Sequence, residues 1–423
     1  MSVPLDFLFY IPLFNTKVKD MPEIALVDCN NFFVSCEQLM NPTLRNRPVC
    51  VLSNNDGCVI ARSKEAKEMG IPMGYPLFKA RKEFKNIIYI SRNFGLYHDI
   101  SNRIITKLLS YTPEVEQYSI DEAFLDLTGL KKLYRCSYEE LIAKIKKEIE
   151  EEIGVPVSIG LAPTKTLAKL ACERAKKIDI LNGLCRIKRC DINEILRLTP
   201  IENIWGIGKN TTALFHKYGI YKCSEIVKQN DFWLKKIWGK RGLELKMELL
   251  GQCVYLVDNK IEPPKSIQKT SAFANFTQDK NYIKDSLHYH SHQICAKLRK
   301  LGMQTEIVAV MLRTKDFKVL VDKIVLPEST DSEFLVNQYV EKLLDSLYDK
   351  NIVYRSSGIF AEKLSSKSTS QLFLFEDEKT KKVKKLSALW DNFEQKYGRG
   401  CFSIGTIKDP QEENKLHGQN YFS

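Results

Sequence analysis

Short apolar runs alternate with segments of helical periodicity along the first half of the chain. Glu23–Cys29, Val49–Ser53 and Val155–Leu161 are apolar runs of strand length, and each predicts a buried strand. In Tyr97–Ser110 the large apolar residues recur every three or four positions, which predicts an amphipathic helix. Strands and helices that alternate in this way predict a domain that combines a sheet with helices over residues 21–190.

Two further helices carry recognisable start signals. Ser137 and Glu140 form a capping-box pattern, in which each side chain bonds the backbone N–H of the other residue. Thr164 precedes another helical segment and is expected to cap it. This last helix is expected to display its basic residues to solvent, namely Lys165, Lys169, Arg174, Lys176 and Lys177.

The remainder of the chain divides by composition. From residue 191 to about 257 the pattern is helical and interrupted by glycines, and the Glu-Pro-Pro-Lys sequence at 262–265 ends it. Residues 266–362 alternate strands and helices again, and the Ser/Lys-rich stretch at 365–370 predicts a linker ahead of a short tail. The chain is therefore expected to contain several domains.

Three acidic residues interrupt the apolar runs. Asp28 ends the first strand, and the pair Asp121-Glu122 separates two apolar segments, 115–119 and 123–127. Desolvated carboxylates repel one another and require a cation, and their oxygens are preferred ligands of Mg²⁺. The acids therefore predict a magnesium site for phosphoryl chemistry, and solvated acids at strand ends are the alternative. Neighbouring side chains on a strand face opposite ways, so we expect a turn or bulge at the pair.

Composition adds a basic surplus to this picture. The net charge of +12 favours a polyanionic partner such as nucleic acid, although solubility alone would also account for it. The twelve cysteines include no CxxC pair, which argues against a zinc ribbon and favours a reducing, cytoplasmic setting. The apolar stretch Val3–Phe14 is too short to span a membrane. Residues 1–20 are expected to form an extension, with a structured arm as the alternative.

Several segments together resemble one known family. Leu26–Glu37 (LVDCNNFFVSCE) and Tyr118–Phe124 (YSIDEAF) closely resemble the two palm motifs of Y-family DNA polymerases. Val51–Ser63 (VLSNNDGCVIARS) and Thr164–Ala171 (TKTLAKLA) resemble the UmuC branch, which includes the catalytic subunit of DNA polymerase V. The resemblance extends from about residue 21 to the C-terminus.

This resemblance implies an α+β multidomain fold, a right-hand polymerase with palm, fingers, thumb and an added little finger. The implied boundaries are an N-terminal extension at 1–20, palm at 21–36 and 97–190, fingers at 37–96, thumb with a helix-hairpin-helix at 191–260, little finger at 265–364, and a clamp-binding tail with a UmuC-type C-terminal region at 365–423.

The resemblance also assigns residues to the reaction centre. Asp28, Asp121 and Glu122 match the catalytic ligands of two Mg²⁺ ions, with the backbone carbonyl of Cys29 completing one site. Phe33 matches the steric gate that excludes ribonucleotides, and core packing beside its aromatic neighbour is the alternative. The positions that contact the incoming triphosphate are Arg62, Ser63, Lys67 and Lys176, for which a solvated face is the alternative.

Further positions match contacts to DNA and to partner proteins. Gly206, Gly208 and Lys209 match the thumb hairpin that binds a DNA phosphate, where a simple helix–helix turn is the alternative. In the little finger, phosphate contacts are expected from Lys297, Arg299, Lys300, Arg313, Lys315 and Lys318. The apolar peptide after the linker resembles the motif that binds the bacterial sliding clamp, and a buried strand is its alternative: Gln371, Leu372, Phe373, Leu374 and Phe375.

The implied activity is low-fidelity, template-directed DNA synthesis across damaged bases. The implied partners are primer–template DNA, dNTPs, the sliding clamp, a UmuD-like accessory subunit and a recombinase filament, within an SOS-type response. Two alternatives remain. A palm-type nucleotide cyclase would use a similar metal site, but it needs neither thumb nor clamp peptide. A catalytically inactive DNA-binding repair factor would not need to keep all three acids.

Overall fold

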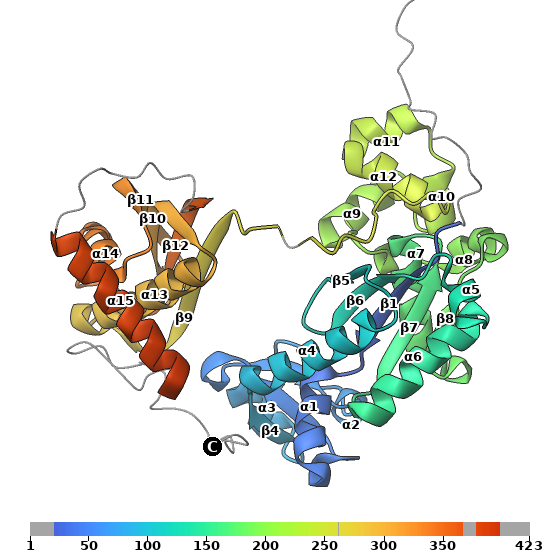
Figure 1. Ribbon diagram of the computed structural model, residues 1–423, viewed down its shortest axis with the longest axis horizontal. Helices are drawn as coiled ribbons and strands as arrows, with labels where there is room; N and C mark the ends of the chain where they lie inside the picture. Colours follow the sequence, from blue (N-terminus) through green and yellow to red (C-terminus); the bar gives the residue numbers. More distant parts are fainter. Residues whose placement is uncertain (1–20, 261, 367–377, 398–423) are drawn as a thin grey trace, which may run out of the picture. The chain divides into compact units, whose positions relative to one another are not determined.

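The computed structural model describes residues 21–260, 262–366 and 378–397 (Figure 1). The chain divides into two compact units. Of the described residues, 21–42 and 94–260 form the first unit, and 43–93, 262–366 and 378–397 form the second. Within the described residues no helix has the length and apolar character that crossing a membrane requires.

A five-stranded sheet forms the centre of the first unit, in the order β5-β6-β1-β7-β8. The central strand β1 is antiparallel to both β6 and β7, and β8 runs parallel to β7. All residues of β1 and β7 are buried, which explains why their sequences are almost wholly apolar. The strands are β1 (Ile24–Cys29), β5 (Val115–Gln117), β6 (Glu122–Asp126), β7 (Val157–Ala162) and β8 (Leu184–Arg186).

The helices beside this sheet include one held unusually close to it. At Gly160 on β7, a Cβ atom would lie 2.1 Å from the backbone nitrogen of Cys172 and 2.2 Å from the carbonyl oxygen of Ala168. Only glycine allows α7 to approach β7 this closely. These helices are α1 (Phe32–Met40), α4 (Phe94–Leu109), α5 (Leu130–Tyr134), α6 (Tyr138–Glu152) and α7 (Lys165–Lys177).

The expected helix starts at Ser137 and Thr164 are both confirmed. Ser137 and the residue at the third helical position of α6, Glu140, form the reciprocal capping box. The hydroxyl of Thr164 accepts a hydrogen bond from the backbone N–H of Leu167 in the first turn of α7. Each cap pairs an N–H group that the first turn of a helix leaves without a backbone partner.

Residues 191–260 add small helices that share one apolar core with the sheet. Phe124 and Leu167 from the sheet region belong to the same cluster as Phe215 and Leu245. The fully buried Glu248 accepts hydrogen bonds from backbone N–H groups that include that of Thr166, at 3.1 Å. These helices are α8 (Ile192–Leu198), α9 (Lys209–Lys217), α10 (Cys223–Val227), α11 (Asp231–Trp238) and α12 (Lys240–Leu249).

The second unit contains two sheets. The smaller one has the order β3-β2-β4 and carries α2 (Lys64–Glu68) and α3 (Leu77–Glu83). Its strands are β2 (Val49–Leu52), β3 (Val59–Arg62) and β4 (Ile88–Ser91). The side-chain amide of Asn55, in the turn between β2 and β3, donates to the carbonyl of Ala272 on the larger sheet at 2.7 Å.

The larger sheet is antiparallel with the order β11-β10-β12-β9. Its strands are 12 or 13 residues long, and α13 and α14 pack against it over an apolar core. The elements are β9 (Ser266–Thr277), α13 (Lys280–Lys300), β10 (Met303–Thr314), β11 (Val319–Thr330), α14 (Glu333–Leu347) and β12 (Tyr354–Ser366).

A further helix, α15 (Glu378–Tyr397), packs on this same module. Arg299 of α13 binds both carboxylate oxygens of Asp391, at 2.6 and 2.8 Å, and its remaining amino group binds Glu333 at 2.6 Å. The ring of Trp390 stacks on His292 with centroids 4.0 Å apart and is almost wholly buried. The sequence predicted only a tail after residue 364, whereas residues 378–397 form a helix that packs against this module.

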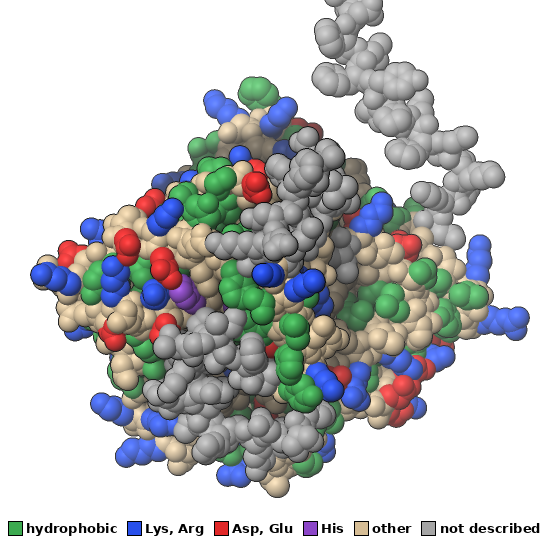
Figure 2. Space-filling view, turned by 60° about the vertical axis from the view of Figure 1, so that its left-hand side comes forward, with side chains coloured by type: hydrophobic (Ala, Val, Ile, Leu, Met, Phe, Trp, Pro, Cys, Tyr) green, Lys and Arg blue, Asp and Glu red, His purple; other side chains and the backbone are tan. Residues whose placement is uncertain are grey.

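The basic surplus of the sequence is visible on the surface. Figure 2 shows Lys and Arg side chains singly and in small groups over the visible face, with apolar side chains between them. This distribution agrees with a net charge of +12. Asp and Glu side chains lie among them, and it is the excess of basic over acidic groups that would attract polyanions.

Candidate active site

Two of the three predicted acids lie side by side on the central sheet of the first unit. Asp28 and Glu122 are register partners on the antiparallel strands β1 and β6. Residues that alternate along a strand share one face, so Asp28 lies on the same face as Leu26 and Glu122 on the same face as Phe124. Leu26 and Phe124 belong to the apolar cluster that includes α7, so both acids lie on the side of the sheet that α7 covers.

The third acid, Asp121, lies in a turn directly before β6. The backbone N–H groups of Tyr118 and Ser119 both donate to the carbonyl of Glu122, which closes the turn. The Ser119 hydroxyl donates to the Asp121 carboxylate at 2.6 Å, and the Cys29 N–H donates to the Asp121 carbonyl at 2.9 Å. The predicted turn at the acid pair is therefore confirmed, and it fastens Asp121 to the end of β1.

Two lysines of α7 pair with the acids on the sheet. The Lys169 ammonium donates to both carboxylate oxygens of Glu122, at 2.8 and 2.7 Å, and Lys176 donates to Asp28. The prediction that the basic residues of α7 face solvent is wrong for Lys169, whereas Lys176 is exposed although it pairs with Asp28. The prediction is also wrong for Lys165, which is buried and paired with Glu116.

The paired acids differ in their affinity for protons. Burial raises the pKa of Asp28 to about 7, and the opposing attraction of Lys176 does not cancel this effect. Burial acts in the same direction on Glu122, but hydrogen bonds from Lys169 and Asp28 outweigh it and lower the pKa of Glu122. Glu122 is thus the more readily ionised of the two, as expected for two carboxylates that share one environment.

The three acids, Asp28, Asp121 and Glu122, offer the kind of oxygen ligand that a hard divalent cation prefers. Three carboxylates contribute oxygen atoms, and Mg²⁺ prefers carboxylate oxygens together with water. Among the described residues, however, no three His, Cys, Asp or Glu side chains form a ready-made metal-binding group. The lysine partners of Asp28 and Glu122 and the serine partner of Asp121 occupy their oxygens instead.

Phe33 follows Asp28 in the sequence and lies in the first turn of α1. Its ring stacks on Tyr97 with centroids 4.5 Å apart and an interplanar angle of 15°. Phe32 is 4% exposed, whereas Phe33 keeps part of its ring accessible, so the core position belongs to Phe32. The Tyr97 hydroxyl donates at 2.7 Å to Glu37, also buried, which holds the ring beneath Phe33 in place. The sequence contains no signal for this support, because only folding brings α4 next to α1.

The predicted triphosphate contacts Arg62, Ser63 and Lys67 belong to the second unit. Arg62 donates to the carbonyl of Ile71 at 2.6 Å. The buried Ser63 hydroxyl caps α2 by accepting from the N–H of Ala66, so it already has a structural role. Lys67 is exposed. A triphosphate role for these residues stays a prediction.

The predicted hairpin residues surround the start of α9. Gly206 has a φ of +87°, a conformation that favours glycine, and Gly208 precedes α9, whose first residue is Lys209. A Cβ at either glycine would meet no atom within 4 Å, so the backbone here is open to a close neighbour. Contact with DNA phosphate stays a prediction.

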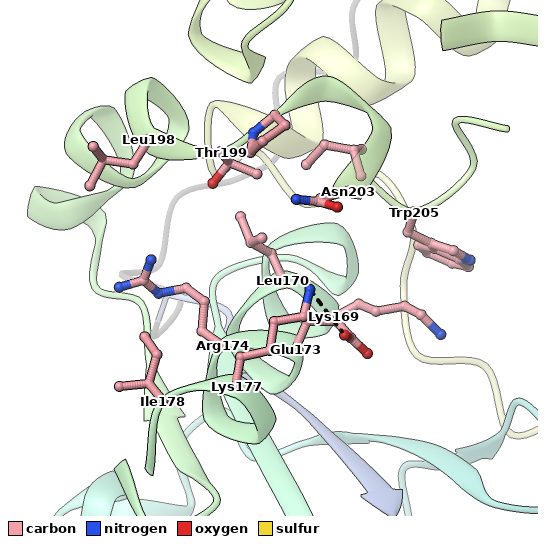
Figure 3. A pocket seen from close by; sticks show the side chains of 12 residues that line it. Lys169, Leu170, Glu173, Arg174, Lys177, Ile178, Leu198, Thr199, Asn203 and Trp205 are labelled. Atoms are coloured by element: carbon pink, nitrogen blue, oxygen red, sulfur yellow. Dashed lines mark ion pairs between the residues drawn. The ribbon is translucent and has the colours of Figure 1, made fainter. Parts of the chain in front are cut away.

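An aromatic contact joins this hairpin to the acid turn. The Trp205 indole N–H donates to the Tyr118 hydroxyl at 3.1 Å, and the two rings meet edge to face. A cleft of about 430 Å³ opens beside them, and Lys169, Glu173 and Trp205 are among its lining residues (Figure 3). Each partner occurs in a segment that the sequence had singled out, but nothing in the sequence indicates that they meet.

Two remaining predictions concern Arg299 in the second unit and the proposed clamp peptide. Arg299 was expected to contact DNA phosphate, but its guanidinium is engaged by Asp391 and Glu333, so this expectation is wrong. The proposed clamp peptide, residues 371–375, lies outside the described residues.

Family models match two long segments of the chain. The model described as the impB/mucB/samB family matches residues 27–173. The model described as the C-terminal domain of the same family matches residues 264–374. Together they include the three acids, Phe33 and the larger sheet of the second unit.

Named relatives and solved structures agree with these matches. Protein UmuC of Salmonella typhimurium is 31% identical over 89% of this chain and 91% of its own length. DNA polymerase IV of Caulobacter vibrioides is 30% identical over 90% and 93%, respectively. The Y-family DNA polymerase chimera Dbh-Dpo4(243-245)-Dbh matches with a TM-score of 0.70 and 27% identity, covering 81% of this chain and 99% of that chain.

Proposed function

Because the chain belongs to the Y family of DNA polymerases, within its impB/mucB/samB group, we propose that it performs translesion synthesis by two-metal nucleotidyl transfer. In this reaction the primer 3′-hydroxyl attacks the α-phosphate of a template-paired dNTP and pyrophosphate leaves. The polymerase right-hand fold with a further C-terminal domain is shared with the solved Y-family structures.

The observation that carries this proposal is the arrangement of the acids. Asp28 and Glu122 are adjacent on paired strands, and the turn that holds Asp121 is bonded to the end of β1. Two Mg²⁺ ions held by these carboxylates and the Cys29 carbonyl would supply charge neutralisation at the attacking and leaving oxygens.

The other residues of the chain position the substrate in this proposal. Phe33, backed by Tyr97, lies against the sugar and leaves no room for a 2′-hydroxyl. Lys176 leaves Asp28 and binds the triphosphate of the incoming nucleotide. Arg62, Ser63 and Lys67 are proposed as further contacts to the triphosphate. Gly206, Gly208 and Lys209 bind a phosphate of the DNA through backbone N–H groups.

The proposed partners are suggested by the relatives. One solved Y-family structure is an insertion ternary complex, which supports primer–template DNA and dNTP as substrates here. The likeness to Protein UmuC supports an SOS-type role with a UmuD-like subunit and a recombinase filament. Residues 371–375 are proposed to bind the sliding clamp.

Primer extension tests the catalytic proposal. With Mg²⁺ and all four dNTPs, the wild-type protein should extend a primer on undamaged and abasic templates. Asp121→Ala should abolish extension. Asp126→Asn is the matched control, because Asp126 lies at the far end of β6, where its carboxylate accepts the N–H of Thr128 at 2.8 Å. Its activity should remain close to that of the wild type.

The same assay separates the enzyme from an inactive accessory factor. A folded preparation that binds primer–template DNA but adds no nucleotide with Mg²⁺ or Mn²⁺ would exclude the polymerase proposal. Equal loss of activity in Asp121→Ala and Asp126→Asn would show that the loss does not report on a metal site.

A further inference from the structure

Helix α7 supplies two of the acids with counter-ions from within the chain. Lys169 and Lys176 are seven positions apart, nearly two full turns, so they project from the same side of the helix. Lys169 contacts both oxygens of Glu122, at 2.8 and 2.7 Å, and Lys176 contacts Asp28. Gly160 fixes α7 tightly on the sheet, which holds both ammonium groups at the acids.

The carboxylate oxygens that Lys169 occupies are the ones that a metal ion would need. Because both Glu122 oxygens accept hydrogen bonds from one ammonium group, a cation that binds the same edge of the carboxylate must displace the lysine or bind against its charge. We propose that Lys169 is a positioning residue that pairs with the Glu122 carboxylate in the metal-free protein and weakens metal binding by competing for it. This inference rests on the proposed metal-binding role of Asp28, Asp121 and Glu122.

The structure provides a place for the displaced side chain. Lys169 lines the cleft of about 430 Å³ between α7 and residues 198–205, and Figure 3 shows it extending toward the Trp205 end. Its ammonium already lies 5.2 Å from the centroid of the Tyr118 ring, whose face attracts cations. Glu173, one turn further along α7, also lines the cleft, but it already pairs with Lys176 at 3.4 Å and with Lys177 at 3.9 Å. Lys169 can therefore leave Glu122 for the open cleft and the face of the Tyr118 ring.

The two lysines differ in what can replace their present partners. Lys176 has a candidate partner in the anionic substrate, so its release from Asp28 is linked to nucleotide binding. Lys169 faces the cleft, and its release is linked to the metal ion alone. Its removal should therefore change metal binding even when no nucleotide is present.

Binding of Mn²⁺ to the full chain, without DNA or nucleotide, tests this inference. Free Mn²⁺ is measured by EPR at pH 8 for the wild type, Lys169→Met, Lys169→Arg and Lys177→Met. Lys169→Met removes the charge and keeps the apolar stem, and it should bind Mn²⁺ about three- to tenfold more tightly, because a like charge has left the site. Lys169→Arg should remain near the wild type. Lys177, which is mostly exposed on the same helix, is the charge-matched control and should show no change.

The outcomes separate the role of Lys169 from the existence of the metal site. Unchanged or weaker Mn²⁺ binding by Lys169→Met, or tighter binding by Lys177→Met to the same degree, would overturn the inference. If Lys169→Met does not fold, Lys169→Gln makes the same test. Asp28→Asn should weaken Mn²⁺ binding in the wild-type background, and failure of that result would refute the metal site itself. Loss of binding in Asp28→Asn together with no effect in Lys169→Met would refute only the role of Lys169.

Discussion

Replacing Gly160 with alanine should destabilise the first unit and misplace the helix that faces the acids. The added methyl group would lie 2.1 Å from the backbone nitrogen of Cys172, about 1.4 Å short of the roughly 3.5 Å of a favourable contact. The nearby atoms belong to the backbone of α7, so no side chain can rotate away and the helix itself must move. Overpacking of this kind costs about 3 kcal/mol. For a unit of this size that lowers Tm by about 6–12 °C.

Thermal unfolding followed by circular dichroism measures this change. Gly208→Ala is the matched control, because nothing lies within 4 Å of a Cβ there and its φ of −92° suits alanine. Its Tm should stay within about 2 °C of the wild type. Primer extension by Gly160→Ala should fall by up to about a hundredfold, because a displacement near 1 Å in a catalytic group has effects of that order. A Gly160→Ala protein with wild-type Tm and activity would refute the claim that this contact positions α7.

Three other predictions concern the sugar gate, the clamp peptide and acid stability. Phe33→Ala should increase ribonucleotide incorporation by about tenfold or more, because it opens the space below the sugar, and unchanged dNTP/rNTP selectivity in single-nucleotide insertion would count against the gate. Alanine at Gln371 and Phe375 should weaken binding to the sliding clamp in fluorescence polarisation while extension without clamp stays intact, so equal affinity would contradict the peptide assignment. Burial lowers the pKa of His290 to about 3, so the folded protein binds this proton only at a lower pH than the unfolded chain does. The free energy of unfolding therefore falls as the pH drops below about 6.5. Denaturant titrations should show a loss of about 2 kcal/mol between pH 7.5 and pH 5 that His290→Gln lacks, and the same loss in the variant would exclude His290 as its cause.

Local signals predicted the features that depend on neighbouring residues. The caps at Ser137 and Thr164 were visible in the sequence because a cap bonds an N–H only two or three residues away. The turn at Asp121 could be expected from the geometry of a strand, on which adjacent side chains cannot face the same site. The strand that carries Asp28 was evident from its continuous apolar run.

Contacts between distant segments were beyond the reach of the sequence. Lys169 was assigned to solvent because helical periodicity identifies the polar side of α7 but not the strand that this side meets, and its partner Glu122 lies 47 residues earlier. Arg299 was assigned to DNA for the same reason, since its partner Asp391 is 92 residues away. In both cases the sequence shows a charged residue but not the distant carboxylate that folding brings to it.

The docking of α15 changes where the body of this polymerase ends. Cutting the chain behind Ser366 would strip Trp390 from the module and leave the Arg299–Glu333 pair without Asp391. Asp391 is 31% exposed and Glu333 still pairs with Arg299 after the cut, so losing Asp391 costs less than the ~3–5 kcal/mol of a broken buried pair. A protein shortened in this way would lose the contacts of α15 as well as the proposed clamp peptide, so its failure in cells would not report on clamp binding alone. A truncation that keeps the folded body whole must fall behind Tyr397.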